Sequence, residues 1–175
     1  HQVQNCSLAI CLSKYALGNE ISSSKLKTAI SKSIWKGRLE KISNNNLFYD
    51  VAHNYEGIKA MLNTINVLYP DKEKAGLFCI KSDKNISAIC KLLKNNFKKL
   101  ILCSDKEGYL VKVSDLLSIM NENNIECLSV DSVEEGVSLL NEYNNPNYLN
   151  LIFGSHYVAS EVYSSIGKYF DRTYN

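Results

Sequence analysis

The sequence predicts an α/β protein: a three-layer, Rossmann-like domain with a mostly parallel sheet and helices on both faces, preceded by two helices. From Leu39 onward, short runs rich in β-forming residues alternate with amphipathic segments. Within residues 57–69 the apolar side chains recur at intervals of three and four, as on one face of a helix. Residues 99–103 and 149–153 are short apolar runs typical of buried parallel strands. Alternation of this kind favours right-handed crossovers within one sheet.

The two helices that precede the sheet can be bounded from their end signals. The first covers the start of the chain and ends at Gly18-Asn19, because a glycine can close a helix. Ser22-Ser23-Ser24 can cap a second helix that runs to about Ser33. We therefore place a domain boundary near here, giving residues 1–34 and 35–175. The expected strand and helix pairs that follow are 47–51 with 57–69, 76–80 with 84–95, 99–103 with 113–123, 126–130 with 132–143, and 149–153 with 156–170.

Composition limits the class of protein and the partners. A chain of 175 residues fits one domain, or one domain with an appended piece of another. A formal charge of +2 is far from the basic surface of nucleic-acid binders, so we expect no nucleic-acid partner. No apolar run approaches the ~20 residues that span a bilayer, so we expect no membrane partner. The six cysteines lie in apolar stretches without metal-ligand spacing, which favours reduced thiols, a cytoplasmic location and no metal site.

A compact polar cluster follows the predicted strand 47–51. Ligands of open α/β sheets bind beyond the carboxyl ends of the strands, so residues at these positions are the first candidates. Asp50, His53 and Asn54 place a carboxylate, an imidazole and an amide close together at such an end. This pattern indicates a binding site, although Asp and Asn also favour ordinary turns.

Two further strand-adjacent positions could bind anions. Arg38 follows the flexible Gly37 and could clamp a phosphate bidentately, the alternative being a solvated surface charge. Ser155 follows the strand 149–153 and is expected to open the last helix, where free N–H groups favour a carboxylate or phosphate. Simple helix capping by Ser155 is the competing interpretation. The polar run 82–85 is interpreted as a helix cap.

Motifs for independent catalysis are missing from the sequence. It contains neither GxxxxGK followed by Ser or Thr nor GxGxxG, so it does not bind a triphosphate by either device. The three histidines come without a nucleophile elbow or a paired Ser and Asp. An enzyme complete in this chain is therefore not expected.

Four motifs occur in order along the chain: His1-Gln2 with Asn5, Trp35-x-Gly37-Arg38-Leu39-Glu40, Asp50-x-Ala52-His53-Asn54, and Gly154-Ser155. Taken together, they resemble those of the folylpolyglutamate and dihydrofolate synthases of the Mur ligase superfamily. The resemblance extends over essentially the whole chain. Asp83-Lys84 also resembles a family motif, while Val51 stands where the family commonly has glycine. The resemblance implies that residues 1–34 are the closing helices of a central ATPase domain and that 35–175 form the C-terminal domain.

The resemblance also implies roles for particular residues. Arg38 would reach the phosphates of ATP and act in catalysis, Asp50 would accept hydrogen bonds from the ribose, and Asn5 would approach the adenine. His53 would act beside an acyl phosphate and the incoming L-glutamate, and Ser155 would hold a glutamate carboxylate. The Mg²⁺ ligands and the phosphate loop are expected in the central domain. The implied partners are ATP, folate or dihydropteroate, and L-glutamate. The parent enzyme is expected to be a monomer, and this chain alone is expected to be inactive.

Two alternatives remain open. Muramyl peptide ligases also carry a Gly-Arg segment followed by an Asp-x-Ala-His strand end. They usually begin the first motif with His-Asn rather than His-Gln, and the diaminopimelate-adding member carries an Asp-Asn-Pro-Arg motif that is missing here. The second alternative is a stand-alone α/β domain that binds a nucleotide or a protein.

Overall fold

The computed structural model describes residues 2–18, 22–33, 35–43, 46–143 and 146–170, and the chain divides into two compact units, His1–Trp35 and Lys36–Asn175. The N-terminal unit contains helices α1 (Gln2–Leu17) and α2 (Ser23–Lys32). Ser22 caps α2 by accepting a hydrogen bond from the Lys25 N–H at 3.3 Å. Both expected helices are present. Their assignment to a central ATPase domain stays a prediction.

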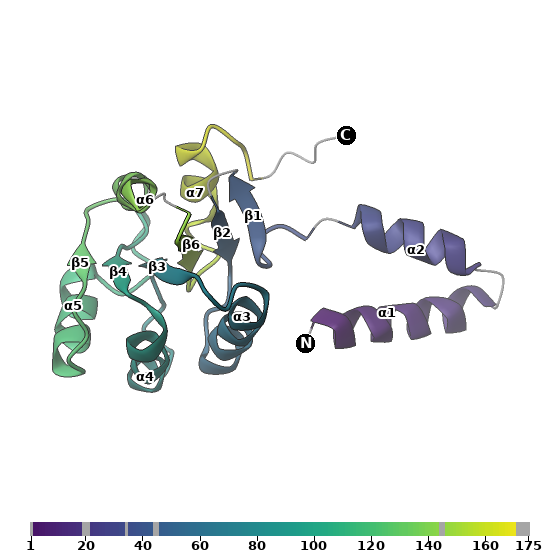
Figure 1. Cartoon of the computed structure of the whole chain (residues 1–175), viewed down its shortest axis with the longest axis horizontal. Coiled ribbons are helices and arrows are strands. Elements are labelled where there is room, and N and C mark those ends of the chain that lie inside the picture. Colours follow the sequence, from purple (N-terminus) through teal and green to yellow (C-terminus); the bar gives the residue numbers. More distant parts are fainter. Residues whose placement is uncertain (1, 19–21, 34, 44–45, 144–145, 171–175) are drawn as a thin grey trace. The chain divides into compact units, whose positions relative to one another are not determined.

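The C-terminal unit is built on a six-stranded sheet with the order β1-β2-β6-β3-β4-β5 (Figure 1). Every neighbouring pair is parallel except β1 with β2, so the mostly parallel sheet predicted from the sequence is confirmed. The three central strands end level, because Asp50 lies opposite Phe153 and Phe153 lies opposite Phe78. The strands are β1 (Glu40–Ser43), β2 (Leu47–Asp50), β3 (Glu73–Phe78), β4 (Lys99–Leu102), β5 (Leu128–Ser129) and β6 (Tyr148–Phe153).

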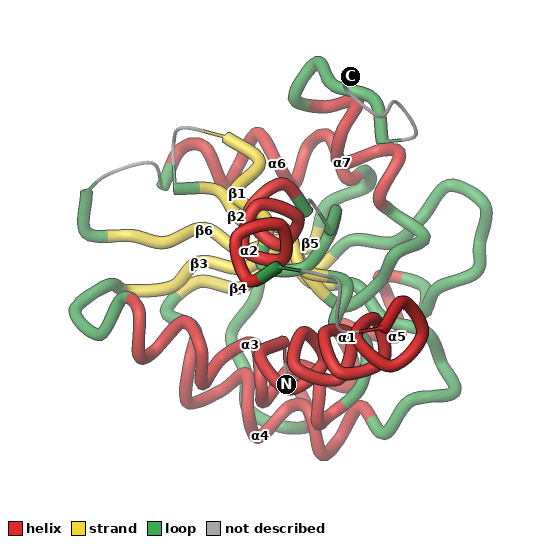
Figure 2. The backbone as a smooth tube through the Cα atoms, turned by 90° about the vertical axis from the view of Figure 1, so that its right-hand side faces the viewer, coloured by secondary structure: helices red, strands yellow, loops and turns green. Residues whose placement is uncertain are grey.

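Helices cover both faces of the sheet, which gives the expected three layers (Figure 2). Helices α3 (Tyr55–Leu68), α4 (Ile86–Asn96) and α5 (Val113–Glu122) pack on one face. Helices α6 (Val133–Glu142) and α7 (Ala159–Ser165) pack on the other. Each face therefore closes its own apolar core against the strands.

Local sequence explains why α3 begins and packs where it does. The Asn54 side chain caps the helix by accepting a hydrogen bond from the Gly57 N–H at 2.8 Å. The buried residues Ile58, Met61, Leu62 and Ile65 follow the helical spacing seen in the sequence. The cap also fixes the end of the segment that links β2 to α3.

The largest differences from the prediction are at two elements. Strand β1 was not expected; it is a short edge strand in which Ile42 alone is fully buried, so it lacks the apolar pattern of the inner strands. The last helix was expected over 156–170, but α7 covers only Ala159–Ser165 because residues 154–158 form bends and turns after β6. None of the helices in the described part of the chain has the length and hydropathy of a membrane span.

Candidate functional site

The carboxyl edge of the sheet brings four of the predicted site residues onto neighbouring strand ends. Asp50 ends β2, His53 follows it, and Ser155 follows the adjacent β6. Arg38 joins them because β1 runs antiparallel to β2, with Glu40 opposite Tyr49, so the residues before β1 lie at the end of β2. The unexpected edge strand is therefore what places Arg38 beside Asp50.

The turn that carries Arg38 is fixed by its backbone. The Gly37 N–H donates to Glu40 Oε2 at 2.8 Å, and the Gly37 carbonyl accepts from the Val51 N–H at 2.8 Å. On the other side of Arg38, the Leu39 N–H donates to Asp50 Oδ2 at 2.9 Å. Gly37 and Leu39 both have positive φ, 68° and 48°, which only glycine adopts without cost. Two carboxylates thus hold the N–H groups on either side of Arg38.

The side chain of Arg38 is exposed and makes no hydrogen bond or ion pair with another residue in the described part of the chain. A guanidinium offers five N–H donors in a planar fork that matches phosphate or carboxylate oxygens. A fixed backbone combined with an unengaged guanidinium is suited to binding an external anion.

Asp50 is 6% exposed and accepts two backbone hydrogen bonds, from Leu39 and, at 2.7 Å through Oδ1, from Ala52. Burial raises the pKa of this carboxyl, and the two hydrogen bonds and the nearby Arg38 charge lower it in part. Each oxygen keeps a further acceptor position. Asp50 therefore anchors the turn before it contacts any ligand.

The imidazole of His53 is half-buried and oriented by its own backbone. Nδ1 lies 2.9 Å from the carbonyl oxygen of Val51. Because a carbonyl only accepts, Nδ1 carries the hydrogen, and Nε2 of the neutral ring is left as an acceptor. The ring is thus poised to take a hydrogen bond, or a proton, from a donor outside the chain.

Ser155 is not where the sequence placed it. It was expected to open the last helix, but α7 begins at Ala159, and Ser155 lies in the loop before it. The residue is 3% exposed, and its Oγ accepts from the Tyr157 N–H at 3.0 Å while its carbonyl accepts from the Tyr49 hydroxyl at 2.8 Å. The helix N-terminus invoked for anion binding is therefore absent at this position, although the hydroxyl can still donate one hydrogen bond.

The remaining predicted positions lie apart from this group. Asn5 is exposed on α1, in the other unit, so its approach to an adenine stays a prediction. Asp83 and Lys84 form an exposed ion pair of 3.0 Å, whose hydrogen bond lowers the pKa of Asp83. The cap of α4 is Asn85, which accepts from the Ala88 N–H.

Two residues that support the Arg38 turn had no role in the sequence interpretation. Glu40, the last residue of the Gly-Arg-Leu-Glu segment, accepts from Gly37 and also from the hydroxyl of Tyr163 on α7. The motif pointed to Glu40, but nothing in the sequence singled out Tyr163, which lies 123 residues further along the chain.

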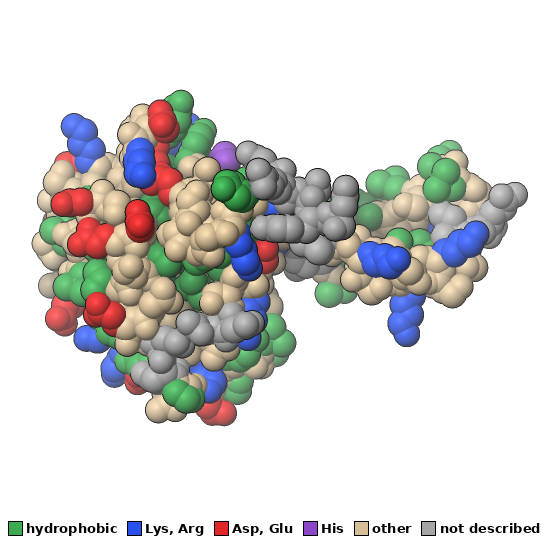
Figure 3. All heavy atoms as spheres, turned by 90° about the horizontal axis from the view of Figure 1, so that it is seen from above, with side chains coloured by type: hydrophobic (Ala, Val, Ile, Leu, Met, Phe, Trp, Pro, Cys, Tyr) green, Lys and Arg blue, Asp and Glu red, His purple; other side chains and the backbone are tan. Residues whose placement is uncertain are grey.

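Charges over the C-terminal unit are mixed. On the face in Figure 3 acidic and basic side chains are interspersed, in keeping with the formal charge of +2. Among the described residues, no group of three or more His, Cys, Asp or Glu side chains gathers as a metal site would require. Ligand selection at the carboxyl edge therefore depends on the local groups rather than on a field of one sign.

The fold and the site define a member of the Mur ligase family, and the chain belongs to it: residues 37–156 match the family described as Mur ligase, glutamate ligase domain. Among curated proteins, it is 23% identical over 163 residues to the dihydrofolate synthase/folylpolyglutamate synthase of Buchnera aphidicola (from Schizaphis graminum). It is 26% identical over 167 residues to the protein of that name from Bacillus subtilis. Each match covers 93% of this chain and 38% of the relative, so the chain spans under two fifths of their length.

Solved structures share the fold. A Mycobacterium tuberculosis folylpolyglutamate synthase complexed with ADP superposes with a TM-score of 0.82 at 19% identity, over 96% of this chain and 40% of that one. Escherichia coli FolC in complex with DHPP and ADP gives a TM-score of 0.81 at 20% identity, over 93% and 38%. At such identities the likeness establishes architecture.

Proposed function

We propose that this chain is the C-terminal part of an ATP-dependent ligase that joins L-glutamate to the carboxylate of a folate or of dihydropteroate. The family match over residues 37–156 and the two curated relatives support the reaction class. The observation that carries the proposal within the chain is the Arg38 turn, whose backbone is held by Glu40 and Asp50 while its guanidinium is unengaged. An arginine so placed can meet an anion without reorganising its backbone.

Arg38 and Asp50 form the nucleotide side of the proposed site. As a phosphoryl group passes from ATP to a substrate carboxylate, negative charge redistributes over its oxygens. Arg38 stabilises that charge most where it develops, in the transition state. Asp50 offers its remaining acceptor positions to ribose hydroxyls. Mg²⁺, held by ligands outside this chain, would neutralise charge on the phosphates.

His53 and Ser155 form the glutamate side of the proposed site. The transfer produces an acyl phosphate, which the α-amine of glutamate attacks with loss of phosphate to give the amide. The attacking amine must lose a proton. Nε2 of His53 can accept it, because the bond between Nδ1 and the Val51 carbonyl fixes the orientation of the ring. Ser155 has one donor left for a glutamate carboxylate oxygen.

The chain alone should neither hydrolyse ATP nor form the amide, since its sequence has no phosphate loop. The six free thiols fit a reducing, cytoplasmic location. A muramyl peptide ligase would share the family match, but the curated relatives named above favour the folate reaction.

The test is kinetic and uses the complete ligase that contains this chain. Phosphate release should require a dihydropteroate or folate substrate together with glutamate. Arg38→Ala should lower kcat by roughly 100- to 1,000-fold, the scale of losing one transition-state charge contact, with a smaller change in the KM for ATP. Arg38→Lys should recover only part, because an ammonium does not bind bidentately.

The matched control is Lys91→Ala, which removes an exposed charge on α4 and should leave kcat unchanged. Wild-type turnover in the Arg38→Ala enzyme would show that Arg38 has no role in catalysis. Turnover that needs no glutamate would reject the ligase assignment itself.

A further inference from the structure

The C-terminal unit begins at Lys36, and the side chain of this residue contacts the last helix and the segment after it. Its Nζ lies 5.5 Å from the centroid of the Tyr163 ring and 5.7 Å from that of Phe170. It also donates hydrogen bonds to the carbonyl oxygens of Tyr169, at 3.4 Å, and of Phe170. The face of an aromatic ring and a carbonyl oxygen both attract an ammonium group. We call these contacts the Lys36 cage.

The Tyr163 ring of the cage is itself fixed by its surroundings. It is 2% exposed and packs edge-on against two other rings, Tyr49 of β2 at 6.2 Å between centroids and Phe170 at 5.2 Å. Its hydroxyl donates to Glu40, the carboxylate that holds the Gly37 N–H. Tyr163 is therefore shared by the cage and by the turn that follows it.

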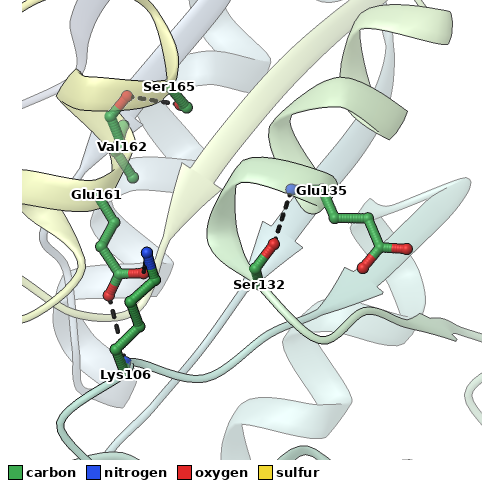
Figure 4. Close-up of polar contacts among 6 residues, drawn as sticks. All are labelled: Lys106, Ser132, Glu135, Glu161, Val162 and Ser165. Carbon is green, nitrogen blue, oxygen red and sulfur yellow. Dashed lines mark hydrogen bonds and ion pairs between the residues drawn. The ribbon is translucent and has the colours of Figure 1, made fainter.

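The helix that carries Tyr163 is anchored by contacts outside the cage. Glu161 of α7 accepts from the Lys106 N–H at 3.3 Å and lies 4.0 Å from the Lys106 ammonium (Figure 4). Toward the end of the helix, the Ser165 hydroxyl donates to the Val162 carbonyl at 2.8 Å. The loop after β4 thus holds α7, and the ring of Tyr163 offers the cage a support that does not depend on the cage itself.

The cage completes the support of the Arg38 turn. Lys36 is followed directly by Gly37, which has a φ of 68° and the conformational freedom of a glycine. On the far side of the turn, Glu40 and Asp50 accept its N–H groups. On the near side, the contacts of the Lys36 ammonium hold the chain where it enters the turn. The Cα of Arg38 is therefore fixed from both directions along the backbone.

We propose that Lys36 is a positioning residue for Arg38, because its cage fixes the backbone from which the guanidinium extends. The reaction in which Arg38 acts rests on the proposed function. Lys36 acts through Arg38, since its own ammonium is already bonded within the chain. Without the cage, the turn samples positions from which the guanidinium does not reach the anion, so fewer molecules are aligned for the reaction.

The structural arm of the test uses hydrogen exchange on the full 175-residue chain. The N–H groups of Val51 and Leu39 close the turn, so their exchange rates report its opening. Lys36→Met keeps most of the stem without the charge and should raise both rates roughly three- to tenfold, the scale of a cation–π contact. Lys36→Arg should restore them, because a guanidinium also stacks on aromatic faces.

The matched control is Lys168→Met. It removes a 2.8 Å hydrogen bond from the same C-terminal segment to the Ile42 carbonyl, outside the cage. The exchange rates of Val51 and Leu39 should therefore stay at the wild-type values. Wild-type rates in Lys36→Met, or an equal rise in Lys168→Met, would overturn the proposal.

The kinetic arm uses the complete ligase and a double-mutant cycle. Lys36→Met should lower kcat roughly three- to tenfold with a smaller change in the KM for ATP, and Lys36→Arg should restore it. In the Arg38→Ala background, Lys36→Met should have no further effect on kcat, because no guanidinium is left to position. A general loss of stability would lower turnover in both backgrounds, so an equal loss in both would overturn the proposal. A raised KM for ATP that persists without the Arg38 side chain would also overturn it, by showing that Lys36 meets the nucleotide itself.

The two arms separate this proposal from the proposed function. If the complete protein forms no amide while Lys36→Met still opens the turn and Lys36→Arg closes it, the ligase assignment fails and the support of the turn by Lys36 stands. If the protein forms the amide and Lys36→Met leaves kcat unchanged, the positioning role fails and the ligase assignment stands.

Discussion

The turn at Arg38 and the loop at Ser155 lie at neighbouring strand ends, but they differ in which groups are hydrogen-bonded within the protein and which remain exposed. Both contain a glycine with positive φ, 68° at Gly37 and 110° at Gly154. In the first, backbone N–H groups are bonded to carboxylates and the Arg38 side chain remains outside. In the second, the glycine packs on the backbone of Cys79, the residue after β3, and the Ser155 side chain is buried and bonded within the loop.

This difference separates residues that can meet a ligand from residues that shape the edge. A buried polar group that leaves its partner loses that hydrogen bond without water to replace it, so the Ser155 loop resists rearrangement. An exposed arginine changes rotamer at little cost. Substitutions in the Ser155 loop should therefore act mainly on stability, and substitutions at Arg38 mainly on turnover.

The largest expected effect is on the glycine that lets the Ser155 loop pack. A Cβ at Gly154 would lie 1.9 Å from the backbone oxygen of Cys79, so Gly154→Ala should destabilise the fold by about 3 to 5 kcal/mol. At Gly37 the Cβ would meet Val51 Cγ1 at 2.7 Å, a side-chain atom that can move, and about 1 to 3 kcal/mol is expected. Urea unfolding of the full chain measures both.

The control for this pair is Gly108→Ala, which has a φ of 77° and no atom within 4 Å of the added Cβ. It should cost about 1 to 2 kcal/mol from backbone strain alone. Equal losses at all three glycines would show that packing on Cys79 does not distinguish the two regions.

The second prediction concerns the support of the Arg38 turn. Tyr163→Phe removes the hydroxyl that donates to Glu40, the carboxylate that holds the Gly37 N–H. We expect a loss of about 1 to 2 kcal/mol in the free energy of unfolding and a shift of the Gly37 amide signal in NMR spectra. Tyr109→Phe, which removes an exposed hydroxyl, is the control and should change neither. An unchanged Gly37 amide signal in Tyr163→Phe would show that α7 does not support the Arg38 turn.

The third prediction compares the two residues on the glutamate side. Ser155→Ala should cost about 0.5 to 1.5 kcal/mol of stability through its lost bond to the Tyr157 N–H, and it should raise the KM for glutamate less than His53→Ala does. His53→Ala should cost less, because the ring is half-buried, yet it should raise the KM for glutamate in the complete ligase by roughly tenfold. Melting curves and glutamate kinetics on the same variants check this. A glutamate KM that rises only in Ser155→Ala would reverse the assignment.

Much of the fold was predictable because it follows from periodicity. The spacing of Ile58, Met61, Leu62, Ile65 and Leu68 predicted α3. The first four are buried, whereas Leu68, the last residue of the helix, is exposed. Strand β1 was not predicted, because an edge strand of four residues with one fully buried side chain has no apolar pattern to detect. The start of α7 was placed too early because the positive φ of Gly154 and the turn closed by Ser155 are not encoded in apolar spacing.

The candidate site was predictable where residues directly follow strands. Parallel topology carries Asp50, His53 and Ser155 to one edge whatever the details of packing. The contact of Glu40 with Tyr163 and the stack of Tyr109 on Tyr157 depend on the register of loops far apart in the chain. No local pattern specifies such contacts, because they arise only when the sheet has closed.

The smallest expected effect is a pH dependence that distinguishes the buried carboxylate of the Arg38 turn from an exposed one. Burial raises the pKa of Asp50 above 3.8 in the folded state, so the folded chain holds this proton more tightly than the unfolded chain. The contribution of Asp50 to stability is therefore greatest at low pH and is lost as the pH rises through its folded pKa. The free energy of unfolding of the wild type minus that of Asp50→Asn should fall over this range and then level off, whatever constant offset the lost hydrogen bond adds.

Asp83→Asn should give the opposite slope, because the pKa of Asp83 is lowered by Lys84 and its contribution is lost as the pH falls. Urea unfolding across this pH range measures both differences, and slopes of the same sign would contradict the distinction.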